Sequence, residues 1–129
     1  MRRRGATLAV LGLAAGLLVP AAACAQGELL YRKYCASCHG LGGAGDGPVA
    51  GSLVPPPTDL RTLDLHIDEL MRAIDGRRTI RAHGDATMPV WGHVLEREKA
   101  GRRYPRRTAL YEVQALAEYV RLFRKRPAR

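Results

Sequence analysis

The run Cys35-Ala36-Ser37-Cys38-His39 constrains this chain more than any other stretch of its sequence. Two thiols separated by two residues can reach both vinyl groups of one porphyrin, and the adjacent imidazole then falls on the iron. The motif therefore predicts one covalently attached haem c, with Cys35 and Cys38 as the attachment points and His39 as the first axial iron ligand.

A cysteine pair at this spacing also occurs in redox dithiols and in zinc sites. A structural zinc site needs four Cys or His ligands, and the sequence contains no second cysteine pair. A thioredoxin-like dithiol would be followed by a long helix, whereas residues 40–51 are rich in glycine and show no helical period. Haem attachment is the interpretation that accounts for the whole motif.

The amino terminus has the pattern of a secretory signal peptide. Met1 is followed by three arginines, residues 6–19 are apolar and uncharged, and small residues fill positions 21–25. A membrane-spanning helix is the alternative, but the stretch is largely Ala and Gly and is broken by Pro20. We expect residues 1–25 to be a cleaved signal peptide and residues 26–129 to be one monohaem domain in the periplasm.

The third cysteine, Cys24, lies at the expected cleavage site. Cleavage after Ala25 satisfies the small-x-small rule and releases a soluble protein that begins at Gln26. The run from Ala21 to Cys24 is also a degenerate lipoprotein box, in which case Cys24 would carry a lipid anchor. The box lacks its usual leucine, so the sequence favours the soluble form and leaves the lipid-anchored form as the alternative.

Hydrophobic spacing predicts three helices in the mature region. They cover residues 27–37, residues 64–75 and a final helix from Thr108, as its N-cap, to about Lys125. The glycine-rich segment 40–57, which ends in three prolines, is expected to be a loop that approaches the ring closely. Because this small domain has only 7 aromatic residues, the haem itself would complete its core.

Taken together, these features resemble the bacterial class I cytochromes c over essentially the whole mature region. The resemblance implies an all-α fold, with three main helices and loops wrapped around one haem. It implies that the first and last helices cross beside the haem, with Gly27 and Tyr119 as the small and aromatic residues that meet there. It also implies that a proline similar to Pro48 offers its carbonyl to the proximal imidazole.

Met88 is the best candidate for the sixth iron ligand. It lies in a loop without regular periodicity, and Pro89 restricts it to extended geometry, which lets its side chain point away from its own backbone. Members of the family often carry a similar Met-Pro pair at this place. A thioether ligand would favour ferrous iron and raise the potential relative to a second imidazole.

Other side chains compete for the sixth position. Met71 lies in an apolar helical stripe and is most simply a packing residue. The remaining histidines, His66, His83 and His93, are more commonly partly exposed polar residues than ligands.

Haem propionates need partners as well. Trp91, the only tryptophan, either packs in the core or donates its indole N–H to a propionate. Four arginines are further candidates among which the sequence does not choose, namely Arg61, Arg77, Arg78 and Arg81.

The charge balance bears on partners. The chain has 21 Lys and Arg against 12 Asp and Glu, and loss of the three leader arginines leaves a formal excess of six positive charges. We expect a monomer that meets acidic redox proteins through a basic face at the haem edge. One basic run is either a docking surface or a solvated loop, and it consists of Arg97, Lys99, Arg102, Arg103, Arg106 and Arg107. An anionic membrane surface is a secondary candidate partner, whereas nucleic acid is not expected because no stacking platform is evident.

Two classes of function follow from these residues. The first is electron transfer between oxidase, reductase or dehydrogenase partners, with both axial positions filled and no catalysis. The second is a haem enzyme or gas sensor with a labile sixth ligand, for which His83 and Asp85 would serve as the distal pair. A haem subunit of a larger complex is a variant of the first class. The Met-Pro loop and the resemblance favour electron transfer.

Overall fold

The computed structural model describes residues 19–77 and 88–124, and these ranges contain helices and loops but no strand. The elements in chain order are α1 (Val19–Tyr34), α2 (Ala36–His39), η1 (Ala50–Ser52), η2 (Leu60–Thr62), α3 (Ile67–Asp75), α4 (Trp91–Glu98) and α5 (Pro105–Arg121), where η marks a 3-10 helix. The all-α class is confirmed. None of the helices within these ranges combines the length and apolar character needed to cross a bilayer.

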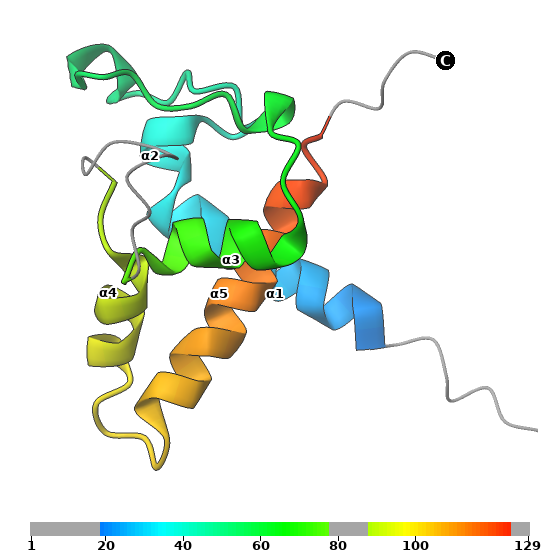
Figure 1. The fold of residues 1–129 in the computed structure, drawn as a ribbon, viewed down its shortest axis with the longest axis vertical. Coiled ribbons are helices and arrows are strands. Elements are labelled where there is room, and N and C mark those ends of the chain that lie inside the picture. Colours follow the sequence, from blue (N-terminus) through cyan, green and yellow to red (C-terminus); the bar gives the residue numbers. More distant parts are fainter. Residues whose placement is uncertain (1–18, 78–87, 125–129) are drawn as a thin grey trace, which may run out of the picture.

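Figure 1 shows how the helices are arranged. Helices α1, α3 and α5 lie across one another at the centre of the molecule. Helix α2 and the loop that follows it lie toward one end of the long axis, and the connection between α4 and α5 forms the other end.

The crossing of α1 and α5 depends on Gly27. A Cβ atom at this position would lie 2.3 Å from the carbonyl oxygen of Ala115 and 2.8 Å from the Cβ of Tyr119. Any larger residue would therefore force the two backbones apart. The expected meeting of Gly27 with Tyr119 at the crossing of the first and last helices is confirmed.

Helix α5 begins earlier than the sequence predicted. Pro105 opens its first turn, where a missing N–H costs little, and the hydroxyl of Thr108 donates to the carbonyl of Tyr104 at 3.0 Å. The prediction that Thr108 caps the helix was therefore wrong. Leu110 lies outside the buried face and is 47% exposed. The buried face consists of Ala109, Val113, Ala115, Leu116, Ala117 and Val120, with Glu112.

Helix α3 was predicted from residue 64 and begins at Ile67. The backbone N–H of His66 donates to the Glu69 carboxylate at 2.7 Å, which satisfies a donor at the helix start. Gly76 ends the helix with φ +67°, a left-handed conformation that glycine adopts without strain. Leu70 and Ile74 form its buried stripe.

Helix α4 was not predicted, because its apolar pattern is short. Only Val94 and Leu95 are aliphatic between Trp91 and Glu98, yet Leu95 is completely buried in the common core. An ion pair just beyond the helix, between Lys99 and Glu112 at 2.9 Å, fastens its end to α5. Tertiary packing thus stabilises a helix at residues 91–98, where the local sequence alone favours a polar loop.

Candidate haem-binding site

The motif forms a one-turn helix. Cys35 precedes α2 as its N-cap residue, and His39 is its last residue. Cys35 is buried, Cys38 is half-buried, and both thiols are free. The two sulfur atoms are therefore available for thioether bonds.

Burial raises the pKa of the Cys35 thiol to about 12, and the neighbouring Cys38 adds to the effect. A redox dithiol works in the opposite direction, because it needs a lowered pKa to supply a thiolate. Within the described ranges, no group of three or more His, Cys, Asp or Glu side chains is arranged to hold a metal ion. The environment of Cys35 is thus unlike that of a dithiol.

The glycine-rich loop is fastened to α2 by backbone hydrogen bonds. The amides of Gly45, Gly47 and Val49 donate to the carbonyls of His39, Cys38 and Ser37, at 2.9, 3.1 and 3.1 Å. These carbonyls lie at the end of a helix and would otherwise lack partners. The loop therefore satisfies the motif's backbone and fixes its position.

Gly47 is the tightest point of this contact. A Cβ atom there would lie 2.3 Å from the carbonyl oxygen of Ser37 and 2.6 Å from its carbonyl carbon. Both are backbone atoms, which cannot rotate away as a side chain can. The glycine is required because the loop runs directly against α2.

An aromatic cluster supports the loop from behind. The ring of Tyr31 lies 5.4 Å from that of Tyr119 and 5.0 Å from that of Phe123, measured between centroids. The buried hydroxyl of Tyr31 donates to the carbonyl of Gly40 at 2.7 Å, and burial raises its pKa. The crossing of α1 and α5 is thereby linked directly to the residue after His39.

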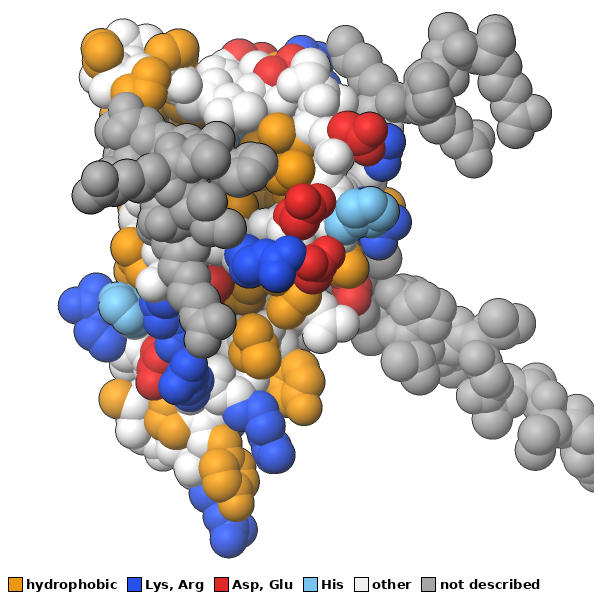
Figure 2. All heavy atoms as spheres, in the orientation of Figure 1, with side chains coloured by type: hydrophobic (Ala, Val, Ile, Leu, Met, Phe, Trp, Pro, Cys, Tyr) orange, Lys and Arg blue, Asp and Glu red, His pale blue; other side chains and the backbone are white. Residues whose placement is uncertain are grey.

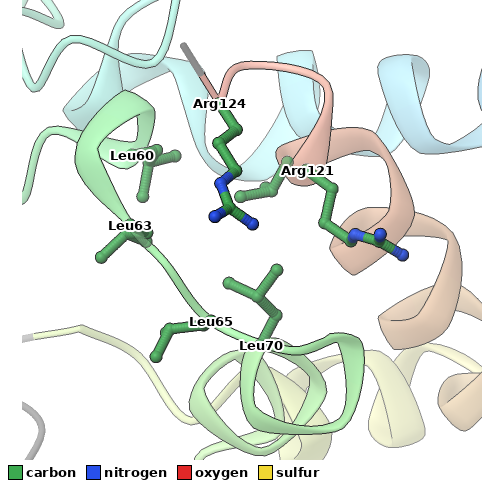
Figure 3. A pocket seen from close by; sticks show the side chains of 7 residues that line it. Leu60, Leu63, Leu65, Leu70, Arg121 and Arg124 are labelled. Carbon is green, nitrogen blue, oxygen red and sulfur yellow. The ribbon is translucent and has the colours of Figure 1, made fainter. Parts of the chain in front are cut away.

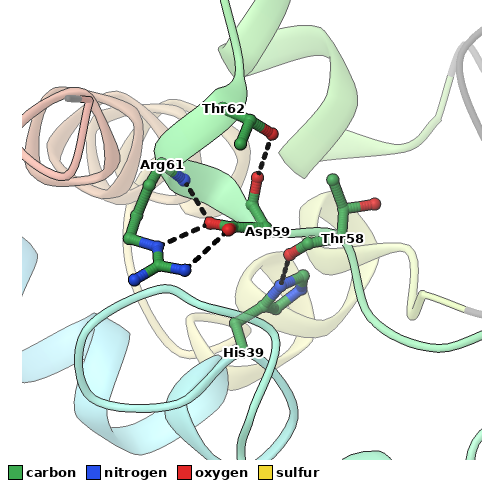
Figure 4. Close-up of polar contacts among 5 residues, drawn as sticks. All are labelled: His39, Thr58, Asp59, Arg61 and Thr62. Atoms are coloured by element: carbon green, nitrogen blue, oxygen red, sulfur yellow. Dashed lines mark hydrogen bonds and ion pairs between the residues drawn. The ribbon is translucent and has the colours of Figure 1, made fainter.

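Figure 4 shows the imidazole of His39 and its partner. Its Nδ1 lies 3.0 Å from the carbonyl oxygen of Thr58, a contact in which the nitrogen donates. Donation by Nδ1 leaves the lone pair on Nε2 as the one free to bind a metal. The resemblance pointed to the carbonyl of Pro48 for this role, and in the structure the carbonyl that meets Nδ1 is that of Thr58, ten residues later.

The segment 58–60, which contains Thr58 and which we call the strap, is itself held in place by hydrogen bonds. The amide of Leu60 donates to the carbonyl of Gly43 at 2.7 Å, which joins the strap to the glycine-rich loop. Asp59 accepts hydrogen bonds from the backbone and the guanidinium of Arg61 at 2.7 to 2.9 Å (Figure 4). Arg61 was a candidate propionate partner, and the structure gives its guanidinium to Asp59.

Met88 lies three residues before α4 and is 37% exposed. The segment between it and α4 is packed on the end of α3, since a Cβ at Gly76 would lie 3.2 Å from the Cα of Val90. Trp91 opens α4, with its ring centroid 5.1 Å from that of Tyr34, the residue just before Cys35. The structure thus places Trp91 against the helix that leads into the motif.

Arg77 joins α3 to α4. Its side chain is 16% exposed and binds Asp75 at 2.7 Å and Glu96 at 2.6 Å, and these pairs raise its pKa. Gly92 is buried beneath this ion pair, because a Cβ there would lie 2.1 Å from a carboxylate oxygen of Asp75. Arg77 therefore bridges α3 and α4 through its two ion pairs, an arrangement we call the Arg77 clasp, and its guanidinium is not free for a propionate. Arg78, Arg81 and His83 lie outside the described residues.

The comparisons with known proteins agree with this geometry. Residues 22–102 match the family model described as cytochrome C oxidase, cbb3-type, subunit III. The chain belongs to this cytochrome c family. It is a class I monohaem c-type cytochrome, and its covalently bound cofactor is haem c. Neither a curated protein nor a solved structure matches the chain. The matched region stops before α5, which the structure adds to the fold through its crossing with α1.

The surface of this cytochrome fits a large apolar cofactor. Several big apolar side chains are exposed on the loop after α2 and on the segment before α4, where a soluble protein would normally bury them. These residues are Leu41, Val49, Leu53, Val54, Met88 and Val90. A porphyrin held by Cys35 and Cys38 would supply apolar surface against which such side chains could pack.

A small hollow lies between η2, α3 and the end of α5. Figure 3 shows leucine side chains from η2, the following segment and α3 facing the end of α5 across it. Its walls are Leu60, Leu63, Leu65, Leu70, Val120, Arg121 and Arg124. The hollow is continuous with the core packing that supports the strap.

The competing ligand candidates have other places. Met71 packs against the core cluster, as the sequence suggested. His66 precedes α3 and uses its backbone N–H for Glu69, and His93 is exposed on α4. The basic run lies on α4, on the connection to α5 and on the first turn of α5, toward the opposite end of the long axis from α2 (Figure 1).

Proposed function

We propose that this cytochrome passes single electrons in the periplasm between respiratory or dehydrogenase partners, through a haem c ligated by His39 and Met88. The observation that carries the proposal is the contact of His39 Nδ1 with the Thr58 carbonyl, which fixes the ring and reserves Nε2 for iron. Bound haem supplies a one-electron iron couple.

The surrounding residues suit electron transfer because they hold a ligand still. His39 is fixed through its side chain by Thr58 and through its carbonyl by Gly45. The loop and the strap are joined to each other by the hydrogen bond from the amide of Leu60 to the carbonyl of Gly43. A rigid first ligand keeps the rearrangement between ferric and ferrous states small, which speeds transfer.

We propose Met88 as the sixth ligand. The close packing of Gly76 on Val90 and the ion pairs of Arg77 hold the start of α4 against the end of α3, and the Met-Pro pair stands immediately before it. The described segment is thus anchored at its helical side, which is the support that a fixed thioether needs. A filled sixth position also excludes small ligands from the iron.

The location and partners belong to the same proposal. The leader pattern of residues 1–25 and covalent haem attachment both support export, with the domain either released at Gln26 or anchored by a lipid on Cys24. The excess of positive charge attracts acidic redox proteins at long range. Because electrons have to pass close to the haem attached beside α2, we propose that such partners meet the protein at its α2 end, away from the basic run.

A second candidate is a haem subunit of a larger complex. It rests on the matched family model, whose description is that of an oxidase subunit. A subunit would pass electrons by the same residues but would not diffuse between partners. Gel filtration of the native protein from detergent-solubilised whole cells separates the two candidates, since a carrier elutes as a small protein and a subunit with its complex.

The ligand set can be tested with optical spectra of the purified haem-loaded protein. We expect a ferric charge-transfer band typical of methionine ligation, and no carbon monoxide binding to the ferrous form. Met88→Ala should abolish the band, admit carbon monoxide and lower the potential. Met71→Ala is the matched control, because it removes a packing methionine, and it should leave the band and the potential in place. An unchanged spectrum in Met88→Ala would refute the assignment.

A further inference from the structure

The connection between α4 and α5 carries a surface that electron transfer does not explain. We call it the basic tip, and it consists of Arg102, Arg103, Tyr104, Arg106, Arg107 and Leu110. Its four arginines fall within six consecutive positions. Figure 2 shows Lys and Arg side chains interspersed with hydrophobic ones over this lower end of the molecule.

The charges of the basic tip have no ion-pair partner among the described residues. Within the part of the chain that the structure describes, no carboxylate lies within ion-pair distance of its four arginines. Several basic residues elsewhere do have partners, as in Arg32 with Glu28 and Arg72 with Asp68. Four unpaired guanidinium groups so close together repel one another, and an external anion would relieve that repulsion.

The basic tip also presents apolar surface. Tyr104 is 50% exposed, and Leu110, which borders the same shallow hollow, is 47% exposed. The guanidinium carbons of Arg103 and Arg107 lie 5.6 and 4.7 Å from the centre of the Tyr104 ring. These cation–π contacts hold the side chains in a partly ordered array around the ring. Less conformational freedom is then lost when an anion binds.

We propose that the basic tip docks this cytochrome on an anionic phospholipid membrane. Guanidinium groups bind phosphate oxygens in pairs, and Tyr and Leu side chains enter the boundary between headgroups and acyl chains. The basic tip is a projecting helical corner (Figure 1), so it can press into a soft headgroup layer. The mixture of charge with half-exposed apolar side chains matches such a layer.

The position of the basic tip determines how the docked protein is oriented. Helix α2 lies toward the opposite end of the long axis (Figure 1). A protein held by the basic tip would keep its haem end away from the bilayer and open to redox partners. The proposal is independent of the sixth ligand, so failure of the Met88 assignment would leave it standing.

Vesicle co-sedimentation tests the proposal with the exported, haem-loaded protein. A Cys24→Ser background excludes a lipid at that position. We expect binding to vesicles of phosphatidylcholine with phosphatidylglycerol, none to phosphatidylcholine alone, and release by salt. Replacing the four arginines of the basic tip by Gln should weaken binding about a hundredfold or more, at roughly fivefold for each charge.

A matched variant separates the basic tip from net charge. It carries Gln at four exposed arginines elsewhere, Arg32, Arg72, Arg121 and Arg124, and so has the same total charge. Equal loss of binding in both variants would overturn the proposal. Replacing Tyr104 and Leu110 by Ser should weaken vesicle binding about tenfold. No loss in that variant, together with equally tight binding of soluble poly-glutamate, would identify an acidic protein as the partner instead.

Discussion

The two ends of this cytochrome are built in opposite ways. At the haem end, residues 35–60, polar backbone groups are paired with one another, and glycines let the chain segments touch. At the basic tip, the long side chains carry charges without ion-pair partners among the described residues. A Cβ at Gly47 would lie 2.3 Å from the carbonyl oxygen of Ser37 in α2, whereas a Cβ at Gly101, beside the basic tip, would meet nothing within 4 Å.

The difference corresponds to what each end has to do. An iron ligand must stay in one place while the charge on the metal changes, so the haem end places its hydrogen bonds inside the molecule. A docking surface must keep its groups for something outside, so the basic tip leaves its guanidinium groups available. Charge and rigidity are therefore separated along the long axis instead of being combined at one face.

The largest effect is expected from a single methyl group at the haem end. Gly47→Ala puts a Cβ against the backbone of Ser37, and we expect a loss of about 3 kcal/mol or more in the free energy of unfolding. Gly51→Ala and Gly101→Ala are the matched controls, because neither new Cβ meets an atom within 4 Å. Urea unfolding of the three variants measures the contrast. A Gly47→Ala protein as stable as the controls would contradict it.

The Arg77 clasp should give the next largest effect. Arg77→Gln leaves Asp75 and Glu96 without their shared cation in a largely buried site, and we expect a loss of about 2 kcal/mol. Arg106→Gln, at the basic tip, should change stability by less than about 0.5 kcal/mol because nothing in the described chain pairs with it. Urea unfolding compares the two variants.

A second measurement tests whether the clasp positions the segment that leads to Met88. Carbon monoxide binding to the ferrous protein should become detectable in Arg77→Gln and stay absent in Arg106→Gln. If Arg77→Gln lost stability but bound no carbon monoxide, the clasp would be structural only.

Local patterns in the sequence predicted much of the haem end. The motif predicted Cys35, Cys38 and His39 as the haem residues, and the resemblance placed Gly27 against Tyr119, where the structure has them in contact. Both predictions depend only on adjacent residues or on one crossing. Thr58 was missed because its role is carried by a backbone carbonyl, which every residue possesses. Only the path of the loop decides which carbonyl faces the imidazole.

The other end was harder to predict for a different reason. Helix α4 has two aliphatic residues, and its stability comes from burial of Leu95 and from the Lys99 to Glu112 ion pair, both of which are tertiary. Arg77 looked like a free cation because its second partner, Glu96, is 19 positions away. The placement of the basic run likewise required the fold, since its sequence shows that it is basic but not where it lies.

The smallest expected effect concerns the hydrogen bond that joins the end of α1, just before the haem end, to the end of α4, just before the basic tip. Tyr34, just before the motif, donates through its hydroxyl to Glu98 at the end of α4, and Lys33 lies nearby. The hydrogen bond from Tyr34, followed by the charge of Lys33, lowers the pKa of Glu98. A lowered carboxyl pKa stabilises the fold at pH values above the ordinary pKa near 4.5, and this contribution is lost as the pH falls through the pKa of the folded state.

Tyr34→Phe should raise the pKa of Glu98 and lower the free energy of unfolding by less than about 1 kcal/mol at neutral pH, a difference that disappears in acid. NMR titration of the Glu98 carboxyl measures the shift, with Tyr111→Phe as an exposed control, and an unmoved pKa would mean that the two ends are not coupled through this bond.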